Sequence, residues 1–292
     1  MGGEAVIKSR VAWTTLEVLS WTQRRFGERG ITSARLDAEV LLAHVLGTSR
    51  VALYTGFDKP LHEKELAAYR DLIRRRLAGE PIAYLVGEQE FWSLPLAVDA
   101  RVLIPRRDTE TLIETAVRLA PGARRFADIG TGSGAIALAL LKELPEATAV
   151  AVDASEDALA VARANAERHG LAARLQLVRG DLVAPLDGGY DLVVSNPPYV
   201  PRGDLAGLAP EVRREPVSAL DGGADGLDVL RRLIPAARGK LAPGGWLLVE
   251  HGFDQGPAVR ALFAAAGLAS VETVRDLAGQ ERVTAGLLPA AA

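Results

Sequence analysis

The sequence contains no cysteine, which excludes disulfide bonds, thiolate metal sites and a cysteine nucleophile. It also has no apolar run of about 18 residues, so we expect no membrane span. Its first ten residues lack the apolar core of a secretory signal, and we therefore expect a cytoplasmic protein. Neither sign of charge is in large excess, because 37 acidic residues oppose 34 basic ones. Bulk charge thus gives no support to a nucleic-acid-binding protein.

The length of 292 residues allows more than one domain. We predict three parts: a small helical bundle over residues 1–80, a connector over residues 81–104, and a main domain over residues 105–292. In the bundle, Leu16, Leu19 and Phe26 mark one apolar stripe, and a later helix is expected from about Leu61 to Leu77. The connector is expected to contain a β-hairpin with its turn at residues 93–95.

Strands alternate with helices in the main domain. The expected strands are Arg125–Ile129, Thr148–Val152, Leu175–Val178, Asp191–Val194 and Gly245–Glu250. Helices are expected between them, over Gly134–Lys142, Ser155–His169 and Leu227–Lys240. This alternation is typical of an open parallel sheet covered by helices on both faces. The last two expected strands, Ser270–Val274 and Arg282–Leu288, have no helix between them and predict an antiparallel hairpin at one edge of the sheet.

The segment Asn196-Pro197-Pro198-Tyr199 follows one of these strands. Proline fixes φ and removes an N–H, so this loop keeps its shape and leaves backbone carbonyls unpaired. A carboxamide, free carbonyls and an aromatic ring side by side form a socket for a planar NH2 group. The alternative is an ordinary proline-containing turn, because asparagine and proline are common in turns.

A glycine-rich turn joins the first strand of the main domain to the helix that follows. It reads Asp-Ile-Gly-Thr-Gly-Ser-Gly from Asp128 to Gly134, and glycines allow a sharp turn and close approach of a ligand. The glycine spacing is one residue tighter than in the dinucleotide fingerprint. Asp128 would repel a pyrophosphate and attract an ammonium or sulfonium group, which favours S-adenosylmethionine over NAD. The residues predicted to bind this cofactor here are Asp128, Gly130, Thr131, Gly132, Ser133 and Gly134.

Two more acidic residues end the next strands. Asp153 is placed to accept hydrogen bonds from ribose hydroxyls, and Asp181 from an adenine amine, with Leu182 packing against the base. Each has a plainer interpretation: Asp153 adds charge to a helix N-terminus, and Asp181-Leu182 is a turn. Three such signals at successive strand ends favour one cofactor crevice, where ligands of open α/β sheets bind. Asn196 follows the next strand end; it is expected at the same crevice and is also predicted to bind the cofactor. No metal site is predicted.

These segments resemble known families. The segment from Asp128 to Gly134 looks like motif I of class I S-adenosylmethionine-dependent methyltransferases. Asn196-Pro197-Pro198-Tyr199 looks like the motif of enzymes that methylate planar amino or amide nitrogens. Further segments resemble the peptide chain release factor glutamine methyltransferases, the PrmC/HemK family; they are Gly79–Tyr84, Leu103–Glu110, Glu215–Leu227, Glu250–Gln255 and Asp276–Arg282. The resemblance covers roughly residues 37–283.

The resemblance implies a Rossmann-like class I methyltransferase fold, α/β, with a mostly parallel seven-stranded sheet and an antiparallel C-terminal hairpin. A small helical N-terminal domain would precede it and dock the substrate. The implied reaction transfers a methyl group from S-adenosylmethionine, leaving S-adenosylhomocysteine, to the side-chain amide nitrogen (N5) of a glutamine. In this family the glutamine lies in the Gly-Gly-Gln loop of class I release factors, which act in translation termination. We expect a monomer with no direct nucleic-acid partner.

The implied catalytic residues are Asn196, Pro197, Pro198 and Tyr199. An amide nitrogen has a delocalised lone pair and no proton that a side chain removes at pH 7, so catalysis must rest on positioning and electrostatics. The Asn196 oxygen and the Pro197 carbonyl would accept the two N–H groups, and Tyr199 would stack on the amide face. The sequence departs from the family twice: Arg107 replaces a proline, and Leu182 replaces an aromatic residue that stacks on adenine.

Three other groups each have two interpretations. Arg106 and Glu110 shape the crevice, or they form a salt bridge at the start of a helix. The run Arg74-Arg75-Arg76 complements a helix C-terminus, or it faces a partner such as RNA. His251 is a structural residue or a base, and the structural role is favoured.

Other functions stay open at this point. There are three alternatives to the release-factor enzyme. The first is a ribosomal-protein glutamine methyltransferase, and the second is an adenine-N6 nucleic-acid methyltransferase with a similar socket for a flipped base. The third is a cofactor-binding scaffold without catalysis. The balanced charge argues against the nucleic-acid enzyme, which predicts a basic groove. The intact Asn-Pro-Pro-Tyr segment argues against the scaffold.

Overall fold

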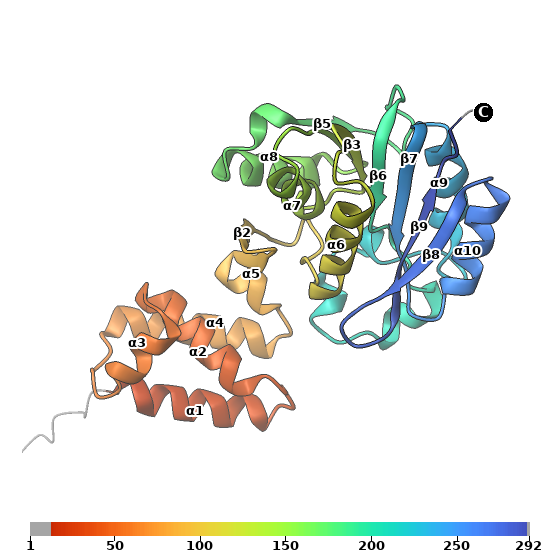
Figure 1. Cartoon of the computed structure of the whole chain (residues 1–292). Coiled ribbons are helices and arrows are strands. Elements are labelled where there is room, and N and C mark those ends of the chain that lie inside the picture. Colours follow the sequence, from red (N-terminus) through yellow and green to blue (C-terminus); the bar gives the residue numbers. More distant parts are fainter. Residues whose placement is uncertain (1–12, 291–292) are drawn as a thin grey trace, which may run out of the picture. The chain divides into compact units, whose positions relative to one another are not determined.

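The computed structural model describes residues 13–290 as two compact units, one ending at Val86 and the other beginning at Gly87 (Figure 1). The first ten residues, on which the expectation about a secretory signal rests, lie outside the described residues. The segment expected as a connector contributes to both units, because residues 82–86 form a helix of the first and residues 88–97 a hairpin of the second. Within residues 13–290, no helix is long and apolar enough to cross a membrane.

The first unit is helical. Its helices are α1 (Thr15–Gly27), α2 (Ala34–Leu46), α3 (Arg50–Thr55), α4 (Glu63–Leu77) and α5 (Ile82–Val86). Phe26, Leu41 and Leu42 are fully buried in its core. Leu16, expected in the buried stripe of α1, is 44% exposed, and Val18 is buried instead. Helical spacing alone does not decide which side of an apolar stripe meets the core, and it did not reveal the short helices α3 and α5.

The three consecutive arginines lie in the last turn of α4, as the helix-terminus interpretation predicts. Arg74 pairs with Asp71, and Arg75 pairs with Glu80. Arg76 is buried and pairs with Asp37 of α2, with 2.7 Å between Nε and Oδ2. Each arginine of the run therefore has an acidic partner within the first unit.

The second unit contains a seven-stranded sheet (Figure 1). Its strands are β3 (Arg125–Ile129), β4 (Thr148–Asp153), β5 (Leu175–Arg179), β6 (Tyr190–Ser195), β7 (Leu241–Glu250), β8 (Ala269–Arg275) and β9 (Glu281–Leu287). They lie in the order β5-β4-β3-β6-β7-β9-β8, with parallel pairing from β5 to β7. β9 is antiparallel to both β7 and β8. The predicted fold class is therefore confirmed, including the antiparallel C-terminal hairpin.

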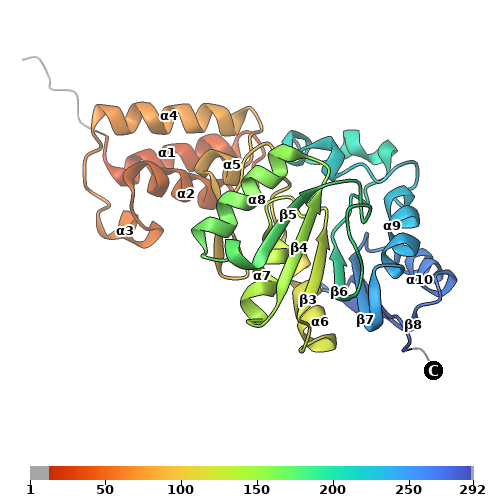
Figure 2. The same ribbon diagram turned by 90° about the horizontal axis from the view of Figure 1, so that it is seen from above.

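Helices cover both faces of this sheet (Figures 1 and 2). α6 (Glu110–Leu119), α7 (Ala135–Glu143) and α8 (Glu156–Arg168) pack on one face, and α9 (Asp228–Arg238) and α10 (Gly256–Ala265) on the other. Successive strand residues point to opposite faces. Phe126 and Leu192 accordingly join the first core, whereas Ala127 and Val193 join the second. Burial on both faces explains why the strands read as continuous apolar runs.

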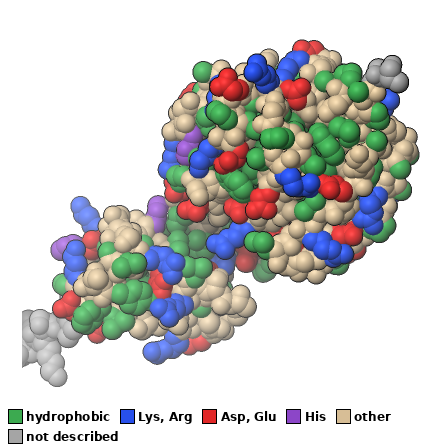
Figure 3. All heavy atoms as spheres, in the orientation of Figure 1, with side chains coloured by type: hydrophobic (Ala, Val, Ile, Leu, Met, Phe, Trp, Pro, Cys, Tyr) green, Lys and Arg blue, Asp and Glu red, His purple; other side chains and the backbone are tan. Residues whose placement is uncertain are grey.

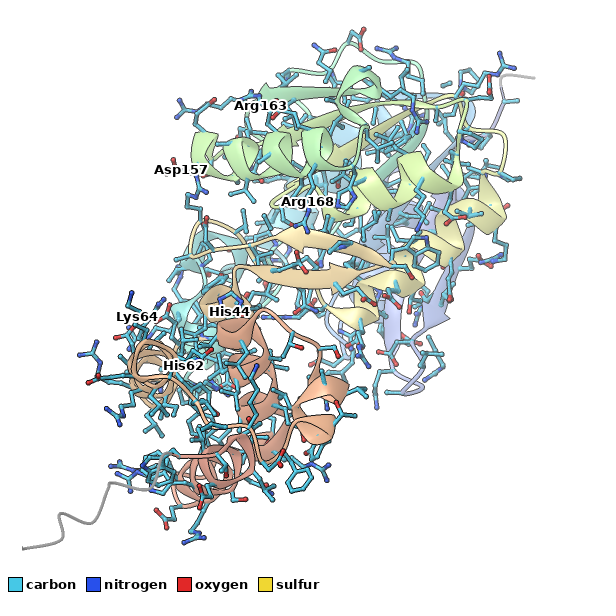
Figure 4. The ribbon with its side chains drawn as sticks, turned by 90° about the vertical axis from the view of Figure 1, so that its left-hand side faces the viewer. His44, His62, Lys64, Asp157, Arg163 and Arg168 are labelled. Carbon is cyan, nitrogen blue, oxygen red and sulfur yellow. The ribbon has the colours of Figure 1, made fainter. Side chains whose placement is uncertain are left out.

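A two-stranded hairpin precedes the sheet, formed by β1 (Glu88–Phe91) and β2 (Leu94–Ala97). Its turn lies at Trp92 and Ser93, which have φ of 51° and 56°, and not at residues 93–95 as predicted. A two-residue turn with positive φ at both positions usually carries Asn or Gly, so the sequence held no signal for it. The hairpin is bound to α8: Arg168, labelled in Figure 4, pairs with Glu88 at 2.6 Å.

Candidate active site

A cavity of about 430 Å³ opens at the carboxyl ends of the parallel strands, within the size range of small-molecule pockets. This is the edge where open α/β sheets bind ligands. The predicted residues that line it are Gly130, Gly132, Asp153, Asp181, Leu182, Asn196 and Pro198. The remaining predicted residues do not line the cavity; they are Asp128, Thr131, Ser133, Gly134, Pro197 and Tyr199. Asp157, in the first turn of α8 and labelled in Figure 4, adds a further carboxylate to the wall.

The glycine-rich turn forms one wall of the cavity. Gly130 and Gly132 have φ of 74° and 55°, in the region that favours glycine, and a Cβ added to either would meet no atom within 4 Å. This open space lets a ligand approach the backbone, so the turn fits a nucleoside cofactor. Gly134 has a different task, because a Cβ there would lie 3.3 Å from Cβ of Ala162 on α8.

Asp128 supports the glycine-rich turn from the side away from the cavity. Its side chain is fully buried, and Oδ2 accepts hydrogen bonds from the Thr131 hydroxyl at 2.7 Å and from the Ala137 N–H at 3.2 Å. Oδ1 has no hydrogen-bond partner among residues 13–290. Burial raises the pKa of Asp128 to about 7. The carboxylate therefore acts through the turn it holds and is not exposed to the cavity.

Asp153 ends β4 and lines the cavity. Its Oδ2 accepts the Gly132 N–H at 2.9 Å, and its Oδ1 accepts the Ser155 N–H at 2.9 Å. A carboxylate has about four acceptor sites, so capacity for ligand hydroxyls is left. Asp153 thus joins the glycine-rich turn to the start of α8 and still presents acceptor oxygens to the cavity.

Asp181 and Leu182 also line the cavity. Asp181 is exposed and pairs with Arg232 of α9, which also lines the cavity. Leu182 has φ of 50°, which a leucine rarely adopts and which costs roughly 1 kcal/mol or more. Backbone strain of this kind is concentrated at ligand sites. The sequence held no signal for the positive φ of Leu182.

The Asn-Pro-Pro-Tyr loop leaves β6 directly beside the glycine-rich turn. The Ser195 hydroxyl donates to the Ile129 carbonyl at 2.7 Å and so joins the two strand ends. Asn196 Nδ2 donates to the Thr109 hydroxyl at 3.2 Å. The Tyr199 hydroxyl donates to Oε1 of Glu250 at 3.1 Å, which fixes the position of the aromatic ring.

A glycine-rich segment after Leu220 holds the backbone of this loop. Val200 N donates to the Leu220 carbonyl and Gly222 N to the Val200 carbonyl, both at 2.9 Å. A Cβ on Gly222 would lie 2.8 Å from Cα of Tyr199, and a Cβ on Gly226 would lie 2.3 Å from its carbonyl oxygen. Gln255 Nε2 donates to that same oxygen at 2.9 Å. The sequence reasoning assigned these residues no task, although adjacent glycines signal close backbone approach.

Glu250, at the end of β7, is the second fully buried carboxylate near the site. Burial raises its pKa to about 7, against the opposing effects of Thr109 and Arg282. Burial and the neighbouring Glu250 raise the pKa of Tyr199 above its usual range, so the phenol stays neutral and donates. His251 is buried, with Nδ1 2.8 Å from the Gly252 carbonyl and Nε2 2.9 Å from the Thr284 hydroxyl. Burial lowers the pKa of His251. His251 does not line the cavity, which is consistent with the structural role favoured for it over a role as a base.

Arg106 and Glu110 do not pair with each other as one interpretation proposed. Arg106 instead pairs with the buried Glu215, whose Oε2 also accepts the Ile104 N–H at 3.0 Å. Glu110 accepts the Trp92 N–H at 3.3 Å. Neither Arg106 nor Glu110 lines the cavity, but Glu215 precedes Pro216, which does. Arg106 thus joins the segment before α6 to one rim of the cavity.

Comparison with known proteins covers both units. Residues 17–87 match the family model described as PrmC N-terminal domain, and residues 107–209 match the one described as Methyltransferase small domain. The release factor glutamine methyltransferase of Geobacter sulfurreducens is 51% identical over 94% of this chain and 96% of its own length. The proteins of the same name from Xylella fastidiosa and Salmonella typhimurium are 47% and 46% identical, over 87% and 88% of this chain.

The chain also resembles solved structures in its fold. The hMettl16 catalytic domain, solved in complex with MAT2A 3′UTR hairpin 6, is 18% identical over 76% of this chain and 83% of its own, with a TM-score of 0.58. At this identity the likeness concerns the fold alone.

Proposed function

The chain belongs to the family of release factor glutamine methyltransferases, and we propose that it methylates the side-chain amide nitrogen (N5) of the glutamine in the Gly-Gly-Gln loop of class I release factors. The family resemblance inferred from the motifs is confirmed by these relatives. One observation supports the proposed active site above all. Asn196 lines the same cavity as Gly130, Gly132 and Asp153, which are predicted to bind the cofactor.

S-adenosylmethionine is the proposed cofactor; when bound, it supplies a methyl group on an electrophilic sulfonium and leaves as S-adenosylhomocysteine. Gly130 and Gly132 allow its close approach, and Asp153 offers acceptors for its ribose hydroxyls. Asp181 accepts from the adenine amine, and Leu182 packs against the base in place of an aromatic ring. Asp128, with Thr131, Ser133 and Gly134, holds the turn that these contacts require.

Residues of the Asn-Pro-Pro-Tyr loop bind the substrate amide and fix its orientation. The Asn196 oxygen and the Pro197 carbonyl accept its two N–H groups, and the ring of Tyr199 covers its face. Pro198 keeps the loop in shape because its φ is fixed. Orientation of two bound reactants contributes roughly 7–11 kcal/mol to lowering a barrier, enough to replace a strong base. Glu250, the nearest buried carboxylate, is bound to Tyr199 and does not line the cavity.

We also propose a division of labour along the chain: residues 1–80 dock the release factor, residues 81–104 connect the two parts, and residues 105–292 transfer the methyl group. α1 supports the docking role because it exposes two large apolar side chains, Trp21 at 46% and Leu16 at 44%. Trp21→Ala is expected to weaken methylation of the whole release factor more than methylation of a short Gly-Gly-Gln peptide. Equal losses on both substrates would count against docking.

We further propose that the protein acts as a cytoplasmic monomer without a nucleic-acid partner. Lys and Arg side chains are interspersed with Asp and Glu on the face seen in Figure 3, which offers no support for the adenine-N6 alternative there. A labelled-methyl assay with purified release factor, ribosomal protein and DNA separates the candidate functions. Label is expected in the release factor and is expected to disappear when the glutamine of its Gly-Gly-Gln loop is replaced. Label in the ribosomal protein or the DNA would assign the other functions, and binding without transfer would favour a scaffold.

A further inference from the structure

Thr109 contacts the central residue of the proposed amide socket, although the sequence analysis assigned it no task. It is the last residue of the short 3-10 helix Arg107–Thr109, just before α6, and its side chain is 4% exposed. Its hydroxyl accepts a hydrogen bond from Asn196 Nδ2 at 3.2 Å, across 87 positions of sequence.

A threonine at the start of a helix ordinarily uses its hydroxyl to cap the helix. Thr109 does not, because its backbone is already helical (φ −65°, ψ −18°) and its side chain makes no capping hydrogen bond. The hydroxyl is therefore available for Asn196, and its removal does not deprive α6 of a cap.

The carboxamide of Asn196 has two ends of opposite polarity, an accepting oxygen and a donating nitrogen. Only the orientation with the oxygen toward the cavity accepts an N–H group of a substrate amide. A hydroxyl both donates and accepts, so Thr109 by itself does not impose one orientation. In the structure the Thr109 oxygen accepts and Asn196 Nδ2 donates, at 3.2 Å. A carboxylate that is ionised only accepts, so the ionised form of Glu250 favours this direction over the reverse.

Two observations support the contribution of Glu250. Its Oε1 accepts from the Tyr199 hydroxyl, whereas its buried Oε2 has no close partner in the part of the chain that the structure describes and retains capacity to accept. Thr109 lowers the pKa of Glu250, although no hydrogen bond joins the two side chains within residues 13–290. The observed hydrogen bond thus runs from Asn196 to Thr109, and the ionised form of Glu250 favours that direction.

We propose that Thr109 is a positioning residue that holds the Asn196 carboxamide with its nitrogen toward Thr109 and its oxygen toward the cavity, and that this orientation selects an amide over a carboxylate. The inference rests on the proposed function, because it concerns how the same socket recognises glutamine. A glutamate side chain would place carboxylate oxygens against the accepting oxygens of Asn196 and Pro197. Free rotation of the carboxamide would weaken amide binding and relieve that repulsion.

The test compares Thr109→Val, which removes the hydroxyl at nearly constant volume, with Thr109→Ser, which retains it. Methyl transfer to a synthetic Gly-Gly-Gln loop peptide is measured as kcat and KM, together with inhibition by the matching Gly-Gly-Glu peptide. For Thr109→Val we expect kcat/KM to fall roughly 10- to 100-fold and the preference for the Gln peptide over the Glu peptide to fall at least several-fold, on the scale of one lost hydrogen bond. Thr109→Ser is expected to retain both within a factor of about 3.

Two controls separate positioning from general damage. Thr115→Val removes another buried hydroxyl of α6, one that donates to the Thr111 carbonyl at 2.7 Å, and should leave the Gln-to-Glu preference unchanged. In an Asn196→Ala background, Thr109→Val should have little further effect on the rate, because the hydroxyl acts through Asn196.

The proposal is overturned if Thr109→Val keeps the wild-type preference, or if Thr109→Ser loses as much as Thr109→Val. An undiminished effect of Thr109→Val in the Asn196→Ala background would also overturn it. Absence of transfer by the wild-type enzyme to any Gly-Gly-Gln substrate would instead overturn the proposed function, so the two failures are distinguishable.

Discussion

The glycine-rich turn after β3 and the Asn-Pro-Pro-Tyr loop after β6 line the same cavity, yet they are held in different ways. Each has a fully buried carboxylate behind it, Asp128 for the first and Glu250 for the second, with one oxygen unpartnered in the described chain. Asp128 belongs to the strand that enters the turn and binds Thr131, three residues away. Glu250 belongs to another strand, 51 residues after Tyr199.

The contacts to Asn196 and Tyr199 come from distant parts of the chain. Thr109 lies 87 residues before Asn196, and Gln255 lies 56 residues after Tyr199. The glycine-rich turn is thus held both by a residue of its own strand, Asp128, and by Asp153, which lies 21 residues after Gly132. The contacts to the catalytic loop come from more distant segments, so it exists in its observed form only when several elements have assembled around it. Variants on the two sides of the cavity should therefore fail in different ways, in substrate turnover on one side and in cofactor binding on the other.

The largest effect is expected at the catalytic loop. Asn196→Ala removes the proposed acceptor for the substrate amide and should lower kcat by roughly three orders of magnitude, in line with the loss of a positioned polar group. Cofactor affinity, measured by calorimetry, should change little, because the side chains that hold the glycine-rich turn are Asp128, Asp153 and Asn165. Near-normal turnover by Asn196→Ala would contradict the assignment of this loop.

The opposite pattern is expected on the cofactor side. Asp153→Ala removes the acceptor that braces Gly132 and faces the cavity, and the affinity for S-adenosylmethionine should fall roughly 10- to 100-fold, the scale of a hydrogen bond to a charged group. At saturating cofactor, kcat should recover most of its wild-type value. A loss of kcat that saturation does not restore would show that the two sides of the cavity are not separable.

A smaller effect is expected from the segment that holds the catalytic loop. A Cβ at Gly226 would lie 2.3 Å from the Tyr199 carbonyl, so Gly226→Ala must displace the loop. We expect kcat to fall roughly tenfold, because small misplacements of positioning groups are costly. The matched change Gly132→Ala, where a Cβ meets no atom within 4 Å, should instead weaken cofactor binding. Thermal unfolding of both variants checks that the fold is intact.

The last prediction concerns the stability of the fold and its dependence on pH, and no change in kcat. Burial raises the pKa of both Asp128 and Glu250 to about 7 in the folded chain, above the ordinary values of 3.8 and 4.5. The folded state then binds more protons than the unfolded state between about pH 4 and 7, so the free energy of unfolding should fall as pH rises through this window, by on the order of a few kcal/mol.

Asp128→Asn and Glu250→Gln should each flatten part of this slope, measured by chemical denaturation across the window without cofactor. If both variants keep the wild-type slope, the two carboxylates do not titrate there. If only one of the two variants flattens the slope, the two buried carboxylates differ in charge at neutral pH. The glycine-rich turn and the catalytic loop would then differ in the charge of the carboxylate behind them.

The sequence predicts the seven strands of the second unit and the helices α7, α8 and α9, because buried strands and glycine turns leave strong local signals, but it does not predict α10. It also located the glycine-rich turn, Asp153 and Asn196 at successive strand ends, and parallel strands bring those ends to one edge. The turn of the hairpin and the positive φ of Leu182 carried no such signal, because neither position has the residue types that usually adopt these conformations.

The side chains that hold the site are recognised only in the folded chain. That Arg106 pairs with Glu215, that Gly222 and Gly226 make room for Tyr199, and that Thr109 meets Asn196 all depend on contacts between segments far apart in the chain. Local propensity and spacing describe a residue and its neighbours within a few positions. The direction of a buried hydrogen bond depends on which groups the fold brings together. It is therefore known only when the groups are seen in contact.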